Sequence, residues 1–274
     1  MEKESTNGGL FMRRRTDIET EDLGNGITRI NEYDFVNCYL IEGENSAALI
    51  DAGAGMADVG AVVKTITDKP VTVLITHAHA DHIGGAVWFP EVWLHPADLR
   101  RGKAYMKPTW RAYFLWCHRY KKKTHKVPYA AAFQKDYSPV IRELADGQAF
   151  DLGGRTIETV LTPGHSPGSV IFRDSLTGAT FTGDNVNLMV TLQFPGGTTV
   201  KEWIVGAEKT LETAGEAPIW GGHGDGRIPR TAVERAIALA NEAVAEGNEK
   251  NSKVKTKRGE NRYPMVVYRA DKAL

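Results

Sequence analysis

The amino-acid sequence predicts one domain of the α/β (α+β) class, and three observations support it. Its 274 residues, 42% of them hydrophobic, can supply one large core. An antiparallel meander at 27–50 leads through a helical pattern at 56–67 into the apolar run 71–75, a strand, helix, strand crossover. Strand patterns return after residue 151, so the chain has two β-rich halves. The expected strands are 27–30, 36–41, 47–50, 71–75, 91–94, 156–161, 169–172, 179–181 and 218–220.

Apolar residues recur at helical spacing in four segments. These expected helices are 56–67, 109–122, 200–213 and 229–247. We expect a flexible polar N-terminal arm at 1–20, which could instead contact a neighbouring subunit, and a main domain at 21–248. Residues 249–274 read as a charged linker followed by a C-terminal edge strand at 263–268. That strand can pair within the chain or with a second subunit as a homodimer, and the sequence leaves both open.

Composition limits the classes of partner. With 34 basic and 34 acidic residues the formal net charge is zero, so no overall field would gather nucleic acid or an acidic membrane surface. Two cysteines, Cys38 and Cys117, are too few for a disulfide framework, and the opening residues lack the apolar core of a signal peptide. No run approaches a membrane span. We therefore expect a cytoplasmic protein that acts on a small molecule.

The segment 76–85, Thr-His-Ala-His-Ala-Asp-His-Ile-Gly-Gly, carries the strongest chemical signal. It follows an apolar strand pattern and holds His77, His79, Asp81 and His82 within six residues. Such side chains are normally hydrated or paired, so packing does not explain them. In extended chain His77, His79 and Asp81 would share one face, and His82 with Asp81 could serve a second ion. Imidazole and carboxylate suit zinc, iron or manganese, and no nearby cysteine makes a closed structural zinc site.

Three later residues follow glycines in positions where a loop could return to this segment. His165 follows Pro163 and Gly164, a rigid residue and then a permissive one. Asp184 follows a glycine at the end of an expected strand, and one carboxylate offers two oxygens to two cations. His223 stands within a run of glycines, which would let the backbone approach the metals closely.

These motifs resemble those of the metallo-β-lactamase superfamily, with the segments 162–169, 181–184 and 221–224 following in order. The resemblance spans roughly residues 27–223. It implies a four-layer αββα sandwich with a helical insert at 98–148. It also implies two divalent ions, with zinc expected and iron or manganese as alternatives.

The resemblance implies a role for each ligand candidate. It places His77, His79 and His165 on one ion, Asp81, His82 and His223 on the other, and Asp184 between them. A metal-bridging hydroxide would then hydrolyse an ester, thioester, lactone or amide, with Asp81 also handling protons as a catalytic residue. Asp51, at the end of the strand pattern 47–50, would orient a ligand from outside the coordination sphere, against the alternative of capping a turn.

The segment 98–148 is rich in aromatic and basic residues. Its position between the first ligand cluster and His165 favours a lid or pocket wall over simple packing or a nucleic-acid surface. The candidate substrate contacts are Tyr105, Trp110, Tyr113 and Phe114. They suggest a partly aromatic or apolar substrate.

Two other functions stay open at this point. A mononuclear iron enzyme resembling persulfide dioxygenases has a similar His-Ala-Asp-His string, but the chain shows nothing like that group's Gly-Cys-Gly-Arg stretch. A metal-stabilised binding module without turnover would instead predict a basic surface.

Overall fold

The structure is a computed structural model that describes residues 18–118, 133, 137–194, 196–247, 253–259 and 263–274. Most of the expected N-terminal arm lies outside these residues. Its last three residues, 18–20, belong to the strand β1. This strand is acidic and largely exposed, so its sequence has no hydrophobic alternation that would predict it.

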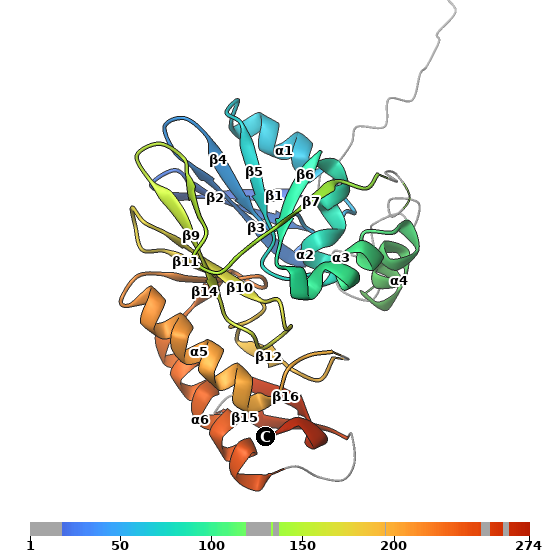
Figure 1. Ribbon diagram of the computed structural model, residues 1–274, viewed down its shortest axis with the longest axis vertical. Coiled ribbons are helices and arrows are strands. Elements are labelled where there is room, and N and C mark those ends of the chain that lie inside the picture. The colour runs from blue at the N-terminus through green and yellow to red at the C-terminus, as the bar shows by residue number, and fades with distance from the viewer. Residues whose placement is uncertain (1–17, 119–132, 134–136, 195, 248–252, 260–262) are drawn as a thin grey trace, which may run out of the picture.

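The first sheet has seven strands and contains the predicted meander (Figure 1). Their order in space follows the chain: β1 (Ile18–Gly24), β2 (Ile27–Glu32), β3 (Val36–Glu42), β4 (Ala47–Ile50), β5 (Val71–Leu74), β6 (Glu91–Leu94) and β7 (Val140–Glu143). The first four strands pair antiparallel and the later ones parallel, with α1 (Val59–Ile66) in the predicted crossover from β4 to β5. The segment that carries the histidine string therefore begins at the carboxyl end of a parallel strand, where open α/β sheets place their sites.

The second sheet has six strands and faces the first. Its order is β14 (Arg227–Ile228), β13 (Ile219–Gly221), β11 (Thr180–Gly183), β10 (Val170–Asp174), β9 (Thr156–Leu161) and β8 (Ala149–Asp151). A buried cluster joins the two sheets and includes Ile41 and Leu74 from the first with Phe172 and Phe181 from the second.

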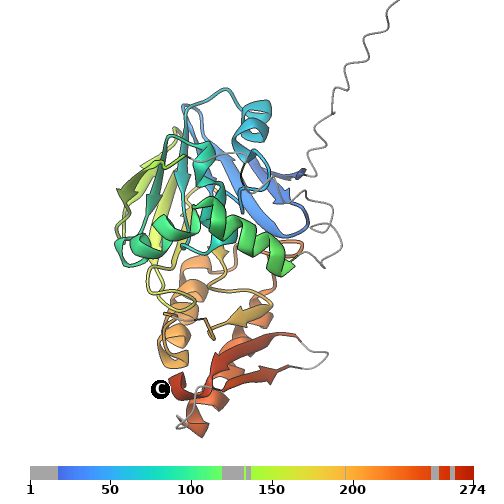
Figure 2. The ribbon, with the colours of Figure 1, turned by 90° about the vertical axis from the view of Figure 1, so that its right-hand side faces the viewer.

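Helices cover the outer faces of both sheets, which gives four layers (Figures 1 and 2). The sequence of β3 is almost wholly apolar because both faces of this strand are buried. Tyr39 and Ile41 face the other sheet, whereas Cys38 and Leu40 join the cluster beneath α1 and α2 (Ala80–Ile83). On the second sheet, α5 (Val200–Ala214) packs on β10 and β11, and α6 (Arg230–Glu246) packs on α5. The predicted αββα sandwich is confirmed.

The expected helical insert at 98–148 contains a strand as well as helices. It contains η2 (Pro96–Asp98) at its start, α3 (Leu99–Tyr105) and α4 (Pro108–His118), but residues 140–143 form β7 beside β6. β7 is largely exposed, so no periodic burial marks it in the sequence. Residues 119–122 of the predicted helix 109–122 lie outside the described part of the chain.

The C-terminal segment was predicted as a linker with an edge strand, and the structure differs. β15 (Val254–Arg258) and β16 (Met265–Arg269) form a hairpin, and β12 (Met189–Thr191) pairs with β16, which is therefore the central strand of a third sheet. Val266 and Tyr268 alternate into the core under α6, while the alternating charges of β15 disguise its strand pattern. No helix in the described part of the chain is both long and apolar enough to cross a bilayer.

Candidate metal centre

The histidine string divides where the strand-like backbone becomes helical. His79 has extended backbone angles and precedes α2, so Asp81 and His82 occupy the first turn of a helix. The alternation predicted for His77, His79 and Asp81 therefore stops at His79, and Asp81 faces a different group of ligands.

Three histidines converge from two loops. His77 Nε2 lies 3.1 Å from His79 Nδ1, and His79 Nδ1 lies 2.6 Å from His165 Nε2. These three nitrogens form one candidate ligand set, with His77 and His165 almost fully buried. Nitrogens at such distances need a shared proton or a cation between them.

Asp81, His82, Asp184 and His223 form the second set, and the ligand atoms within each set lie within 4.8 Å of one another. Asp184 Oδ1 is 3.0 Å from His223 Nε2 and 3.5 Å from His82 Nε2. Its other oxygen, Oδ2, is 3.1 Å from His223 Nε2 and 3.7 Å from His165 Nε2, in the three-histidine set. The structure thus brings all seven predicted ligands together, with Asp184 between the two sets.

Hydrogen bonds to the outer ring nitrogens orient the imidazoles. His165 Nδ1 donates to the Thr191 carbonyl at 2.7 Å, and His223 Nδ1 donates to the Phe35 carbonyl at 2.6 Å. A carbonyl oxygen can only accept, so each Nδ1 holds the proton and each Nε2 presents its lone pair to the centre. Thr191 is the last residue of β12, so the third sheet supports one of these contacts.

Asp51 supports two ligands from the end of β4. Its carboxylate accepts from His82 Nδ1 at 2.7 Å and from the Thr76 amide at 2.8 Å, and the Thr76 hydroxyl touches His77 Nδ1 at 3.1 Å. The left-handed backbone at Asp51, with φ +61°, turns the chain so that the carboxylate reaches both residues. His82 Nε2 is buried and makes no hydrogen bond to the described residues. Such an orphaned lone pair, among carboxylates, fits a cation ligand.

The three-histidine set favours neutral imidazole. Burial lowers the pKa of His77 and of His79 well below the usual value, and the neighbouring histidines add to the effect. Burial also lowers the pKa of His165, although Asp184 opposes it. Neutral imidazole is the form that binds a metal.

The other set balances positive and negative groups. Burial would lower the pKa of His82, but the Asp51 and Asp184 carboxylates outweigh it and raise that pKa. Asp184 likewise outweighs burial and raises the pKa of His223. Burial would raise the pKa of Asp184, but His223 and His82 lower it well below its usual range. A cation bound here would take over the charge balance that protons supply.

Aromatic residues line both sets. The Tyr105 ring centre is 6.1 Å from that of His79 and 4.9 Å from that of Trp110. On the other side, Phe114 lies edge-on to Phe35 with ring centres 4.8 Å apart. Three of the predicted substrate contacts therefore come from α3 and α4 near the centre.

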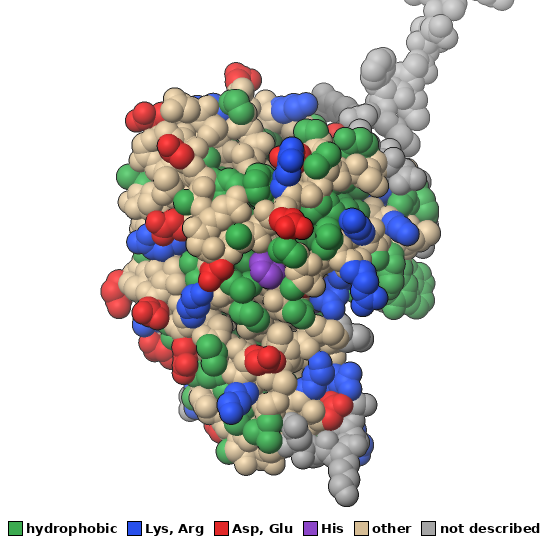
Figure 3. Space-filling view, viewed as in Figure 1, with side chains coloured by type: hydrophobic (Ala, Val, Ile, Leu, Met, Phe, Trp, Pro, Cys, Tyr) green, Lys and Arg blue, Asp and Glu red, His purple; other side chains and the backbone are tan. Residues whose placement is uncertain are grey.

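The fourth predicted contact, Tyr113, points elsewhere. It is 54% exposed and stacks against Trp116 on α4, where hydrophobic side chains gather at the surface (Figure 3). Its ring also lies edge-on to Trp110, with ring centres 5.7 Å apart.

Two aromatic residues beside the ligands had not been predicted. The ring centre of Phe194 lies 5.4 Å from that of His79 and 6.1 Å from that of His165. The ring centre of Phe35 lies 5.8 Å from that of His223. Phe194 follows β12, and Phe35 follows a turn in which Tyr33 and Asp34 have positive φ. No periodic pattern marks either residue, because only the folded loops bring them to the metals.

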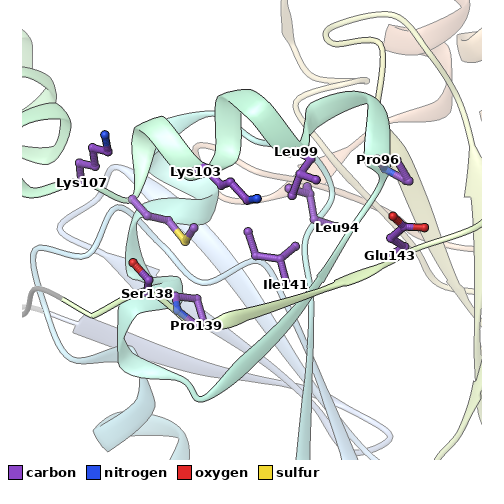
Figure 4. A pocket seen from close by; sticks show the side chains of 10 residues that line it. Leu94, Pro96, Leu99, Lys103, Lys107, Ser138, Pro139, Ile141 and Glu143 are labelled. Carbon is purple, nitrogen blue, oxygen red and sulfur yellow. The ribbon is translucent and has the colours of Figure 1, made fainter.

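A separate hollow of about 570 Å³ lies between α3 and β7 (Figure 4). Leu94, Leu99, Met106 and Ile141 supply apolar lining, and Lys103 and Lys107 stand on the helical side. None of the seven ligand candidates lines it, so it is distinct from the metal centre.

Comparison with known proteins identifies the family. Residues 32–226 match the family model of the metallo-beta-lactamase superfamily, which is most of the chain. The protein belongs to that superfamily. The predicted family is therefore confirmed.

Individual relatives agree with the predicted hydrolase class. The acyl-coenzyme A thioesterase MBLAC2 of Gallus gallus is 26% identical over 211 residues, which cover 69% of this chain and 73% of that protein. An atrochrysone carboxyl ACP thioesterase of Aspergillus chevalieri is 29% identical over 154 residues, 55% of this chain and 40% of that protein. The crystal structure of TTHA1623 in a di-iron-bound form has 30% identity and a TM-score of 0.52, covering 69% of this chain and 87% of its own. The protein is a hydrolase of this superfamily.

Proposed function

We propose that this protein hydrolyses acyl thioesters with a partly aromatic or apolar acyl group, at a centre of two divalent metal ions. The position of Asp184 carries the proposal, because its carboxylate reaches both ligand sets: Oδ1 lies near His82 and His223, and Oδ2 lies near His223 and His165. His77, His79 and His165 would hold one ion, and Asp81, His82 and His223 the other, with Asp184 shared. Zinc is the proposed ion, and iron and manganese are the alternatives, since imidazoles and carboxylates suit all three. Two such ions, when bound, supply Lewis acidity and lower the pKa of a water toward ~7.

The residues of the chain set the orientation of the centre and move protons. Thr191, Phe35 and Asp51 keep three imidazoles in the tautomer that presents Nε2. Asp81 Oδ2, 3.4 Å from His223 Nε2, is placed to accept a proton. A thiol leaving group has a pKa of about 8.5, so it departs without a strong acid beside it. This favours thioesters over amides, whose amine must be protonated to leave.

The aromatic residues around the ligands support the choice of acyl group. Tyr105 and Phe194 flank His79, so an acyl chain beside the three-histidine set would contact apolar rings. The thioesterase activity of MBLAC2 and of the ACP thioesterase lends further support.

Removing the metals tests the proposal. Protein treated with chelator and shown by elemental analysis to be metal-free should hydrolyse butyryl-, benzoyl- and palmitoyl-CoA roughly 100-fold more slowly or worse. Adding zinc should restore the rate, and iron and manganese are added separately. An aryl ester, a lactone and a β-lactam complete the panel. Full thioesterase activity in metal-free protein would contradict the proposal.

The number of metal ions per chain distinguishes the proposed hydrolase from the mononuclear iron oxygenase alternative. Two ions per chain and release of a free thiol support hydrolysis. A single iron, with oxygen consumed in the presence of a persulfide, would assign the chain to the other class.

Replacing Phe194 by alanine tests the acyl contact. We expect KM for benzoyl-CoA to rise about 10-fold with little change in kcat, since burying an aromatic ring contributes roughly 1.5–3 kcal/mol. Steady-state kinetics with acyl groups of increasing size measures the effect. Phe150→Ala is the matched control, because Phe150 packs on Trp93 and contacts no ligand histidine. Equal losses in both variants would place Phe194 outside the substrate site.

A further inference from the structure

Asp98 is a buried carboxylate that no step of the proposed hydrolysis uses. It lies at the junction of η2 and α3 and is 1% exposed. An aspartate before a helix normally accepts hydrogen bonds from the first backbone amides of that helix. Asp98 makes no such bond. Apart from an ion pair with Arg101 of that helix, with 3.8 Å between Oδ1 and the guanidinium nitrogen, its carboxylate serves another part of the molecule.

Both Asp98 oxygens bond to the loops that carry the three-histidine set. Oδ2 accepts from the Ala78 amide at 3.0 Å and from the Ser166 hydroxyl at 2.6 Å. Oδ1 accepts from the Gly168 amide at 3.2 Å. One charged group thus ties together two loops that are far apart in the sequence, and charge-assisted bonds of this kind are the strong ones.

Each histidine of that set stands next to one of these bonds. Ala78 lies between His77 and His79, and Ser166 directly follows His165. The residues bonded to Asp98 therefore lie between two ligands in the first loop and directly after the ligand in the second. In contrast, none of the other four ligand candidates neighbours a residue that donates to Asp98.

The contact with Gly168 is close enough to depend on glycine. A Cβ built on Gly168 would lie 2.8 Å from Asp98 Cγ, a distance that real side chains do not adopt. The loop after His165 therefore rests directly on the carboxylate. A methyl group at this position would push the two apart.

From this arrangement we infer that Asp98 is a positioning residue for one ion of the pair. It holds His77, His79 and His165 in register with each other and acts only through them. The inference rests on the proposed two-metal centre. It predicts that loss of Asp98 weakens the ion of the three-histidine set and leaves the other ion unchanged.

Metal affinities in two backgrounds test this selectivity, measured by competition with a chromophoric zinc chelator and independently of hydrolysis. His223→Ala should retain the ion of the three-histidine set, and His165→Ala should retain the other. Adding Asp98→Asn should weaken zinc binding at least about 10-fold in the first background and less than 3-fold in the second. Cobalt substitution gives a second readout, since the visible absorption of Co²⁺ should change only in the first background.

Asp174→Asn is the matched control, because Asp174 is equally buried and bonds Arg155 and Thr177 at the opposite end of β10. It should lower thermal stability without changing either affinity. Gly168→Ala disturbs the same contact from the other side and should also weaken zinc binding in the first background only. This second variant keeps the test decisive if Asp98→Asn folds poorly. Equal weakening in both backgrounds, or no weakening in either, would overturn the inference. Wild-type protein that binds two zinc ions but hydrolyses no thioester would refute only the proposed function.

Discussion

Asp184→Asn is expected to lower kcat/KM for acyl thioesters by about 10²- to 10³-fold and to weaken both metal ions together. The reason is geometric: both oxygens of Asp184 lie about as close to His223 Nε2, at 3.0 and 3.1 Å, and Oδ2 is also 3.7 Å from His165 Nε2 in the other set. An amide has nearly the same shape, but it replaces one charged oxygen with a donor. Isothermal titration with zinc, alongside kinetics on benzoyl-CoA, measures both consequences.

Asp81→Asn is the control for Asp184→Asn. Asp81 belongs to the second ligand set, with Oδ2 at 3.7 Å from His82 Nε2 and 3.4 Å from His223 Nε2, so its loss should weaken one ion and spare the other. Loss of a single ion in Asp184→Asn would show that this carboxylate is not shared, and the two-metal proposal would then lose its main support.

The ligand set was predictable because its residues occur in short sequence motifs. His77, His79, Asp81 and His82 stand within one string, and glycines precede Asp184 and His223. The division of the string between two ligand sets was not predictable from alternation, because a helix begins after His79. Only the local backbone decides which face Asp81 takes.

The groups that orient the ligands could not be read from the sequence, apart from Asp51. Thr191 and Phe35 act through backbone carbonyls, which every residue has, so their identity carries no signal. Phe194 reaches the centre because β12 pairs with β16, a strand some 75 residues later. That pairing depends on a C-terminal hairpin whose charged first strand resembles a linker.

The same distinction explains the fold. Strands buried on both faces, such as β3 and β5, were predicted because their apolar runs have one interpretation. Exposed edge strands were missed, since β1 and β7 bury too little to leave a periodic pattern. The apolar runs therefore predict the central strands, whereas the four-layer arrangement was expected from the resemblance to the superfamily.

Arg155→Met should destabilise the fold by about 3–5 kcal/mol without changing metal affinity. Arg155 pairs with Asp174, which lies at the end of β10 opposite the ligands. Arg155 is 5% exposed and makes a two-pronged ion pair with Asp174. It also donates to the Glu42 carbonyl in the first sheet, so it joins the two sheets. Methionine keeps most of the volume but leaves the Asp174 carboxylate buried and unpaired. Urea unfolding at pH 7 measures the difference.

The effect of Arg155→Met should depend on pH in a defined direction. Burial alone would raise the pKa of Asp174, but hydrogen bonds from Arg155 outweigh it and lower that pKa below 3.8. A depressed carboxyl pKa stabilises the fold above the unfolded value and loses that contribution as pH falls through the folded value. The difference between wild type and Arg155→Met should therefore shrink from pH 7 toward pH 3. Arg142→Met, which breaks an exposed pair with Glu91, should cost at most ~1 kcal/mol, and an equal cost for Arg155→Met would disprove the buried link.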